Sequence, residues 1–297
     1  MFATALPSDA VAASIPVERR GQGRVLVEAR ALDGRTVRGR IEEEGFARVR
    51  FPRSGRRGRS LEAVMINTGG GLAGGDASQS CLHAGRDAQL VVTTQAAEKI
   101  YRSDGATSRI AVELTAEAGA RLHWMPQATI VFDGARVERS IAAEVAADAS
   151  LLLVEPVILG RTARGERLTY GRLHDRWRIR RGGRLVYADG LQLDGDIAGA
   201  LDRRATAGGW AAFATLLLVS PDAESRLEAV RAALGLGESE PDGLACELPD
   251  GLDAGASAWD GMLSVRLLAR DGAPLESAIR RAIAALGVEE VPRIWHS

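Results

Sequence analysis

Residues 120–159, ARLHWMPQATIVFDGARVERSIAAEVAADASLLLVEPVIL, decide the fold class of this chain. Three short stretches within them, 120–125, 128–134 and 150–159, are rich in leucine, β-branched and aromatic residues, which is typical of β-strands. Similar stretches lie elsewhere, at residues 24–32, 46–51, 61–67, 88–94, 109–114 and 175–180. Short strands that recur about every 10 to 15 residues predict an all-β sandwich, barrel or solenoid. No repeat of fixed length is visible, so among solenoids only an irregular one fits.

The C-terminal part follows a different pattern, in which strands alternate with helices. Leu227, Val230 and Leu234 fall at helical spacing, and a later stretch begins with Pro274 and ends at Gly287, as amphipathic helices often do. We expect strands at residues 209–220 and 262–270 and helices at 221–237 and 274–287. The sequence therefore predicts a mainly β body with about two α-helices near the C-terminus.

The composition is that of an ordinary globular protein, with 46% hydrophobic and 26% charged residues among 297. A net charge of -1 gives no general attraction to nucleic acid or to an anionic membrane. No apolar run approaches the roughly 20 residues of a membrane-spanning helix. Cys81 and Cys246 lie far apart, which favours a reduced, cytoplasmic protein over a disulfide scaffold. We expect a flexible lead-in over residues 1–18 and a single domain over residues 19–297.

The stretch NTGGGLAGGD, residues 67–76, contains five glycines: Gly69, Gly70, Gly71, Gly74 and Gly75. It is not a phosphate-binding loop, because the lysine and hydroxyl residue of that motif are missing and Asp76 would repel a phosphate. Glycines permit positive φ angles and close backbone approach, so a tight turn between strands is the simpler interpretation. Asn67 and Asp76, which frame the glycines, are also common turn residues.

Three further polar groups follow predicted strands: Lys99, Tyr101, Arg102 and Ser103 in the first, Asp133 in the second, and Arg161 and Glu166 in the third. Each group has a plain interpretation as a turn. Polar residues at the ends of several strands can also converge into a recognition surface or line a polar channel. The four histidines, His83, His123, His174 and His296, have no spacing typical of a zinc site. Asp76, Asp133 and Glu166 could still relay a cation weakly.

The order of the motifs resembles the urease accessory protein family UreD, called UreH in some organisms. The resemblance rests on NTGGGLAGGD (67–76), TTQAAEKIYRS (93–103), PQATIVFDGA (126–135), EPVILGRTARGE (155–166), WRIR (177–180) and PRIW (292–295). It covers roughly residues 20–296. Each motif is weak alone, but their order and spacing are specific.

This resemblance implies an irregular β-helix or solenoid-like fold and a maturation factor that is not an enzyme. It also implies partners, namely UreF, the GTPase UreG and apo-urease, with a homodimer as one expectation inside the assembled complex. Nickel would pass transiently along an internal polar passage, with no tightly bound cofactor. Carried over onto this sequence, the polar positions of the family are Asn67, Asp76, Lys99, Tyr101, Arg102, Ser103, Asp133, Arg161 and Glu166.

Two other function classes remain open from the residues alone. A β-sandwich hydrolase or lyase could draw its acid and base from Asp76, Asp133, His123 and Glu166, although a pair can always be chosen from 39 acidic residues. A nucleic-acid binder could use the arginines of residues 171–184, which alternate with apolar residues on a predicted strand. The near-zero net charge favours a protein partner over nucleic acid for these arginines.

Overall fold

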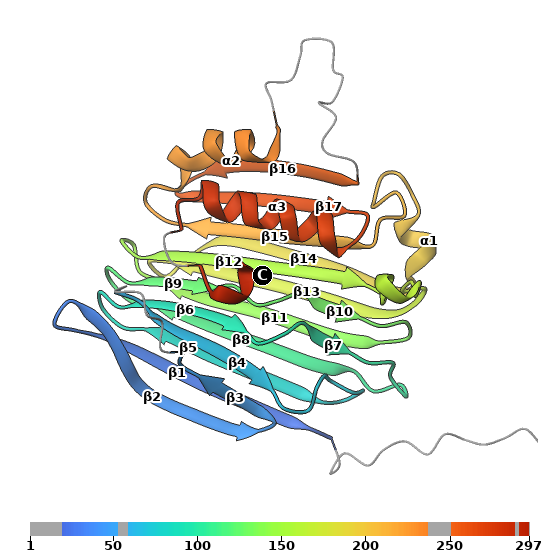
Figure 1. Ribbon diagram of the computed structural model, residues 1–297, viewed down its shortest axis with the longest axis horizontal. Coiled ribbons are helices and arrows are strands. Elements are labelled where there is room, and N and C mark those ends of the chain that lie inside the picture. Colours follow the sequence, from blue (N-terminus) through green and yellow to red (C-terminus); the bar gives the residue numbers. More distant parts are fainter. Residues whose placement is uncertain (1–19, 53–58, 237–250, 289–290, 297) are drawn as a thin grey trace, which may run out of the picture.

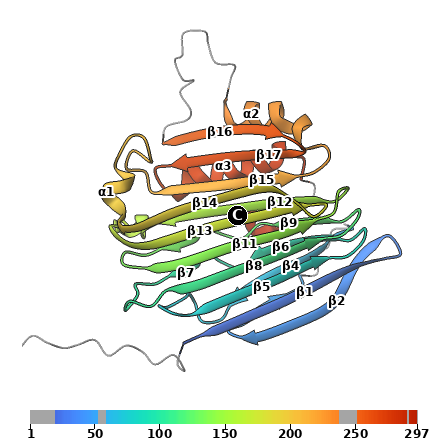
Figure 2. The same cartoon turned by 180° about the vertical axis from the view of Figure 1, so that it is seen from behind.

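The computed structural model describes residues 20–52, 59–236, 251–288 and 291–296. Its body consists of two β-sheets that face each other; Figure 1 looks onto sheet B, and Figure 2 shows sheet A from behind. Sheet A contains β14 (Arg184–Asp196), β13 (Tyr170–Arg181), β11 (Arg136–Val145), β8 (Ser108–Ala116), β5 (Ala77–Ala84), β1 (Gln22–Leu32) and β2 (Arg35–Gly45), in that order. The predicted lead-in at residues 1–18 and Cys246 lie outside the described residues.

Sheet B carries the helices of the C-terminal part on its outer face. Its strands, in order, are β16 (Leu252–Trp259), β17 (Met262–Ala269), β15 (Ala212–Val219), β12 (Ser150–Leu159), β9 (Arg121–Trp124), β6 (Gln89–Thr94), β4 (Leu61–Asn67) and β3 (Ala47–Arg50). Two short strands, β7 (Glu98–Ile100) and β10 (Thr129–Val131), pair with each other beside this path, and β10 also pairs with β12. The helical segments are α1 (Ile197–Leu201), α2 (Leu227–Leu234) and α3 (Gly272–Ala285), with 3-10 turns η2 (Thr162–Arg164), η3 (Ala223–Arg226) and η4 (Arg293–Trp295).

The middle of the chain winds as an irregular solenoid. From β4 to β13 the long strands alternate between the sheets, and each passage through sheet B and sheet A completes one coil. Strands of successive coils run parallel within each sheet. The coils differ in length, since their sheet B strands begin at Leu61, Gln89, Arg121 and Ser150. The predicted mainly β, irregular solenoid-like fold is therefore confirmed.

The predicted strands are present, two with the predicted bounds and the others with ends shifted by a few residues, but several further strands gave no clear signal. These are β2, β5, β7, β11, β14 and β16. The sequence of β5, ASQSCLHA, and that of β11, RVERSIAAEV, are rich in alanine and polar residues. They form strands because each is hydrogen-bonded between parallel neighbours on both sides, a tertiary effect that outweighs local propensity.

The two predicted C-terminal helices are present and cover the outer face of sheet B, with different ends. The first is shorter than predicted, since η3 precedes α2 and α2 ends at Leu234, and α3 begins at Gly272, before Pro274. In α3 the buried face is Leu275, Ala278, Ile279, Ala282 and Ile283, which pack in one cluster with β15 and β17. The chain leaves α2 through Gly235, at a φ of 78°, and α3 is followed by Gly287, at a φ of 65°. Both glycines adopt the left-handed conformation that ends many helices.

Candidate functional site

All nine polar positions predicted from the sequence lie at one end of the sandwich, where the strands of sheet B end. We call this end the motif corner. The glycine loop rests on β7 and on the residues that follow it: Leu72 N–H donates to Lys99 O at 2.7 Å, and Tyr101 N–H donates to Leu72 O at 2.9 Å. The Tyr101 hydroxyl donates to Gly70 O at 2.9 Å. The first two motifs of the sequence thus form a single unit.

The glycines of the loop permit this close approach. Gly71 has a φ of 150°, and a Cβ there would lie 2.4 Å from Tyr101 Cε2 and 2.8 Å from Lys99 O. Gly70 and Gly75 also have positive φ angles, 73° and 87°. Gly69 and Gly74 do not, but a Cβ on Gly74 would lie 2.6 Å from the Ser103 hydroxyl. A side chain at Gly71 would therefore both strain the backbone and displace its neighbours.

Asp76 and Asn67 anchor the two ends of the loop. Asp76 accepts the backbone N–H of Gly21 at 2.6 Å on one oxygen and that of Ala73 at 2.8 Å on the other. Asn67 accepts the N–H of Gly69 at 2.8 Å and donates to both oxygens of Glu98 at 3.1 Å. Because both Asp76 oxygens already hold backbone donors, this carboxylate acts first as a structural anchor.

Asp133 and Glu166 anchor the next corner of the solenoid in the same way. Asp133 Oδ1 accepts the Thr169 N–H at 2.8 Å and the Thr169 hydroxyl at 2.7 Å, and Oδ2 faces Arg102 at 3.2 Å. Glu166 accepts the Asp133 N–H at 3.0 Å and pairs with Arg161. The Arg161 guanidinium also lies 4.7 Å from the centre of the Phe132 ring. Ser103 completes the corner, since its N–H donates to Gly134 O at 3.0 Å.

The electrostatics of these carboxylates follow from their donors. Burial works against the ionised form of Asp133, but the hydrogen bonds from Thr169, Tyr170 and Arg102 outweigh it and lower its pKa. The hydrogen bond from Arg161 lowers the pKa of Glu166. Both groups are therefore held as carboxylates at neutral pH, with their oxygens occupied.

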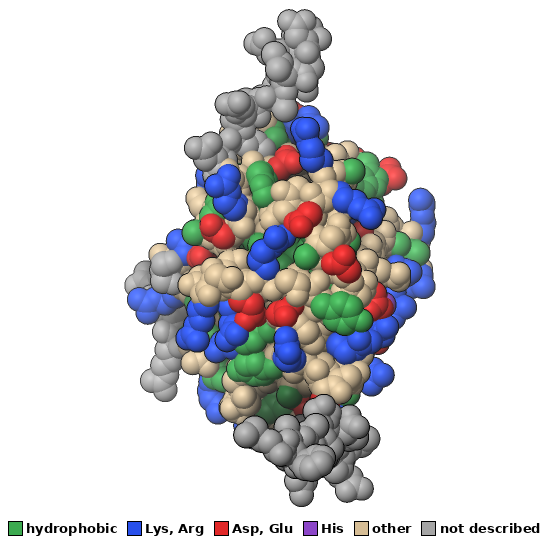
Figure 3. Space-filling model, turned by 90° about the vertical axis from the view of Figure 1, so that its right-hand side faces the viewer, with side chains coloured by type: hydrophobic (Ala, Val, Ile, Leu, Met, Phe, Trp, Pro, Cys, Tyr) green, Lys and Arg blue, Asp and Glu red, His purple; other side chains and the backbone are tan. Residues whose placement is uncertain are grey.

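An open hollow of ≈ 900 Å³ lies beside the motif corner, between the end of β10, η2 and the start of α3. Tyr101 and Phe132 form part of its wall, in edge-to-face contact with ring centres 5.2 Å apart. Lys99, the only lysine of the chain, Arg164 and Arg270 also line it. Figure 3 looks onto this end of the molecule, where charged side chains of both signs are interspersed with hydrophobic ones.

A second group of charged residues lies inside the sandwich, and sequence reasoning missed it. Arg139 on β11, Glu155 on β12 and Asp175 on β13 are 6%, 3% and 8% exposed, and Arg139 forms ion pairs with both carboxylates. We call these three residues the polar seam. Trp124 Nε1 donates to Glu155 at 2.5 Å and Trp177 Nε1 donates to Asp175 at 3.2 Å, which satisfies further oxygens of the seam.

The polar seam crosses the sandwich at one level, between two apolar clusters. On each of the three strands the inward positions two residues before and after the charged residue are apolar and buried: Val137 and Ile141, Leu153 and Val157, and Leu173 and Trp177. Side chains at spacing of two share one face of a strand. The three charged residues thus interrupt the hydrophobic interior. Buried charges are tolerated at such positions only when they are paired, as these are.

The polar seam separates two hollows that both reach it. The hollow on the β3 and β4 side, ≈ 170 Å³, is bordered by Asn67, Ser80 and Glu98. The hollow on the β14 side, ≈ 490 Å³, is bordered by Thr215, Asp189 and Arg266. Arg139 and Glu155 line both of them. Arg139 and Glu155 therefore border a hollow on each side of the polar seam.

Burial gives the interior carboxylates the opposite electrostatics from those of the motif corner. Desolvation raises the pKa of Glu98 above its usual value, despite the hydrogen bond from Asn67. Desolvation also raises the pKa of Glu155; Arg139 opposes this shift and Asp175 adds to it. Burial alone would lower the pKa of Arg139, but the two carboxylates raise it. The polar seam thus contains one guanidinium and two carboxyl groups, so it has fewer positive groups than acidic ones.

The sequence did hold a signal for the polar seam. Glu155 is the only charged residue in the apolar run 150–159, and such a residue in a fully buried strand calls for an internal partner. Arg139 and Asp175 gave less warning, because β11 was not predicted and Asp175 stands beside the exposed arginines of β13. In that strand Trp177 and Ile179 are buried while Arg176, Arg178 and Arg180 are exposed, as the alternation predicts.

The acid and base candidates of the enzyme hypothesis lie in two separate places. His123 lines a hollow on the outer face of sheet B that contains none of Asp76, Asp133 and Glu166. No group of three or more His, Cys, Asp or Glu side chains in the described part of the chain is arranged to hold a metal ion. Within the same residues, no helix is long and apolar enough to cross a membrane.

Comparison with known proteins places the chain in a family. A family model described as "UreD urease accessory protein" matches residues 20–296. Urease accessory protein UreD of Methylobacterium sp. (strain 4-46) is 46% identical over 285 residues, 96% of this chain and 98% of that protein. UreD 2 of Methylorubrum populi is 47% identical over 95% of this chain and 93% of its own length, and UreD of Rhodopseudomonas palustris (strain BisB18) is 44% identical over 98% and 99%. With this coverage and identity, the chain belongs to the UreD family of urease accessory proteins.

Proposed function

We propose that this chain is a non-enzymatic maturation factor that guides Ni²⁺ to apo-urease through the polar interior of its sandwich. The observation that carries the proposal is the pair of hollows that meet at Arg139 and Glu155. Glu98 borders the first hollow, and Asp175 and Asp189 border the second, so carboxylates lie on both sides of the meeting point. In this proposal Ni²⁺ is a cargo and not a resident cofactor.

The charge balance of the polar seam favours a travelling cation. With two carboxylates and one guanidinium, the seam is net negative when both acids are ionised. A divalent cation would stabilise the ionised form of Glu155, whose pKa burial raises, and of Glu98, whose pKa is raised in the same way. Carboxylate oxygens spaced along a wall bind a borderline cation weakly, which suits transit better than storage.

Arg139 stands in the proposed route and acts as a barrier to it. Its guanidinium repels a cation unless Glu155 or Asp175 exchanges it for the metal. When the metal ion replaces the guanidinium of Arg139 at one carboxylate, each buried carboxylate keeps a positive partner. Removal of the guanidinium without a replacement would leave a buried charge unpaired. The seam would therefore pass one cation and close again behind it.

The partners proposed for this work are UreF and the GTPase UreG on the delivery side and apo-urease on the receiving side, in the cytoplasm. The relatives' names, which describe urease accessory proteins, support a role in urease maturation. GTP hydrolysis is assigned to UreG, in keeping with the missing phosphate-loop lysine of this chain. A pair of these chains within the assembled complex would supply two such routes.

The test is nickel loading of urease in cells that express urease and the other accessory proteins with variants of this chain. We expect Glu98→Gln and Glu155→Gln to lower the nickel content and activity of urease several-fold, while the complex is still recovered by affinity isolation. Glu138→Gln is the matched control, because Glu138 is next to Arg139 on β11 but faces outward, with a 40% exposed side chain. Full nickel content with both interior variants would refute the route.

A second arm distinguishes the interior route from one along the motif corner. Asp76→Asn and Glu166→Gln alter carboxylates that anchor backbone. If these two variants lose nickel loading with the complex intact and the interior variants load normally, the cation passes along the corner. Loss of the complex itself would assign Asp76 and Glu166 a structural role.

A further inference from the structure

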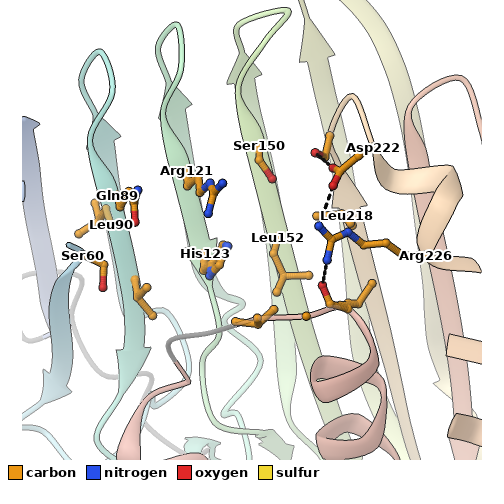
Figure 4. Close-up of a pocket in the computed structure, with 15 residues that line it drawn as sticks. Ser60, Gln89, Leu90, Arg121, His123, Ser150, Leu152, Leu218, Asp222 and Arg226 are labelled. Carbon is orange, nitrogen blue, oxygen red and sulfur yellow. Dashed lines mark hydrogen bonds and ion pairs between the residues drawn. The ribbon is translucent and has the colours of Figure 1, made fainter. Parts of the chain in front are cut away.

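A separate hollow lies on the outer face of sheet B, where its parallel strands begin, opposite the motif corner (Figure 4). We call it the His123 pocket. Its volume is ≈ 220 Å³, and its walls come from the starts of β6, β9 and β12, from η3, and from the turn after α3. It shares no lining residue with either interior hollow. A ligand in the His123 pocket would therefore not contact the residues that line the proposed nickel route.

The sheet register brings the polar side chains of this pocket together. Gln89, Arg121 and Ser150 are direct neighbours across β6, β9 and β12. One step further along the same face, His123 lies between Val91 and Leu152. Figure 4 shows Arg121 and His123 projecting from the same side of β9. The pocket thus has a row of hydrogen-bonding groups above an apolar floor.

The charge of the pocket is positive. Arg226, across the pocket from β9, donates to Leu286 O at the end of α3 and pairs with Asp222 at 2.6 Å. The other Asp222 oxygen accepts from the Ser220 hydroxyl. Arg121 is exposed and forms no ion pair or hydrogen bond through its side chain with the described residues. The pocket lining therefore includes two guanidiniums and one carboxylate, and the oxygens of that carboxylate are both in use.

His123 adds an unsatisfied group to this positive pocket. Its Nδ1 is fully enclosed and has no hydrogen-bond partner among the described residues, and the same holds for Arg226 Nε. Enclosure, together with the neighbouring Arg121, lowers the pKa of His123 to about 4, so the ring is neutral at physiological pH. A neutral ring offers one donor and one acceptor nitrogen. Buried polar atoms are normally paired, so the enclosed Nδ1 of His123 is a hydrogen-bonding position that a ligand in the pocket would satisfy.

We propose that the His123 pocket binds a small oxyanion of the hydrogencarbonate or phosphate type. The planar guanidinium of Arg121 matches the spacing of two oxygens in such an anion. Ser150 and Gln89, on either side of Arg121, supply further donors for its oxygens. The hydroxyl that both anions carry near neutral pH can pair with the neutral imidazole of His123, which accepts or donates according to its tautomer.

Other classes of ligand fit this pocket less well. A metal cation would be repelled by Arg121 and Arg226, although a neutral histidine is otherwise a good ligand. A long polyanion needs an open track of cations, whereas this pocket is bounded by Leu286, Gly287 and Val288 after α3. A compact anion with few oxygens fits both the positive charge of the pocket and its small, bounded size.

The test is titration of the full chain with sodium hydrogencarbonate or sodium phosphate, at an ionic strength held constant with sodium chloride. Binding is followed by calorimetry and by the NMR signals of the His123 ring. We expect saturable binding of at least one anion, with a shift of the His123 signals, and an affinity about tenfold weaker in Arg121→Ala. Arg121→Gln serves as a second variant if the alanine variant folds poorly.

Arg176→Ala is the control, since Arg176 is an exposed strand arginine on the other sheet. Its affinity should stay within about twofold of the parent. Comparison of the two affinities shows whether the pocket prefers hydrogencarbonate or phosphate. The proposal fails if neither anion gives a saturable change at His123, if Arg121→Ala and Arg121→Gln bind as tightly as the parent, or if Arg176→Ala weakens binding equally.

Discussion

The motif corner and the polar seam use the same carboxyl groups under opposite conditions. At the corner, Asp133 and Glu166 lie near the surface, surrounded by backbone and side-chain donors, and their pKa values are lowered. In the seam and its hollow, burial works against the ionised forms of Glu155 and Glu98, and their pKa values are raised. Ionisation of the corner carboxylates therefore stabilises the fold, whereas burial opposes ionisation of the interior carboxylates.

This contrast gives a physical criterion for telling acids that anchor the fold from the acids proposed to guide the cation. Asp76 is structural in this sense, because each of its oxygens accepts a backbone N–H and a ligand would have to displace these contacts. A carboxylate that burial makes reluctant to ionise gains most from a cation. Interior acids that lower stability are retained where function needs them.

Loss of Arg139 should have the largest effect. Arg139→Met removes the only cation that pairs with Glu155 and Asp175 within the described residues, so two enclosed carboxylates lose their partner. We expect a loss of about 3 to 5 kcal/mol in the free energy of unfolding, measured by urea denaturation. The double variant Arg139→Met, Glu155→Gln should recover part of it. A loss below about 1 kcal/mol for the single variant would show that the seam tolerates unpaired acids.

Removal of a corner carboxylate should have an intermediate effect. Asp133→Ala leaves the N–H groups of Thr169 and Tyr170 and the Thr169 hydroxyl without their acceptor. We expect a loss of about 1 to 3 kcal/mol, measured as a lower denaturation midpoint. Asp133→Asn keeps one acceptor oxygen and should lose less. Equal losses in the two variants would mean that the charge, and not the hydrogen bonds, holds this corner together.

The pH dependence of two glutamate variants should differ in sign, with the smallest effects. The pKa of Glu98 is higher in the folded than in the unfolded chain, so its ionisation lowers stability above that pKa, and the penalty fades as pH falls toward 4.5. Glu98→Gln should thus be more stable than the parent at pH 7, by less than about 1 kcal/mol, with the gain shrinking toward pH 4.5.

Glu166→Gln should behave in the opposite way. The lowered pKa of Glu166 gives stability above its unfolded value of 4.5, which is lost as pH falls through the folded pKa. This variant should be less stable than the parent at pH 7, with the difference closing below pH 4.5. Unfolding curves for both variants at several pH values provide the measurement. Curves of the same sign would contradict the distinction between corner and interior.

The fold was predictable from sequence where single strands carry their own signal. Leu61–Asn67 and Ser150–Leu159 appear with the predicted bounds, because apolar residues dominate both. β5 and β11 were missed, because their strand state depends on parallel neighbours that lie one coil away in the sequence. Local patterns cannot report a partner so distant, and coils of unequal length removed the periodicity that would have revealed it.

The site was predictable in part for a related reason. Motif order identified the nine corner residues, and the structure gathers all of them at one end. The motif order did not predict that Asp76 accepts two backbone N–H groups. In the sequence, an aspartate beside a glycine run looks the same whether it binds backbone or a ligand. Glu98 stands next to Lys99 in the sequence, yet desolvation dominates its pKa, and enclosure is a property of the assembled hollow.

The parallel coils have a consequence for how the chain folds. Arg121 pairs with Gln89 in the coil behind it and with Ser150 in the coil ahead, and no hairpin in this region can form by itself. Each coil must wait for its predecessor as a template, and until its successor arrives it presents an unpaired edge that other chains can join. Folding should therefore proceed slowly and in the direction of synthesis, with a growing edge that is prone to aggregation until the antiparallel strands β15, β17 and β16 complete the sheet.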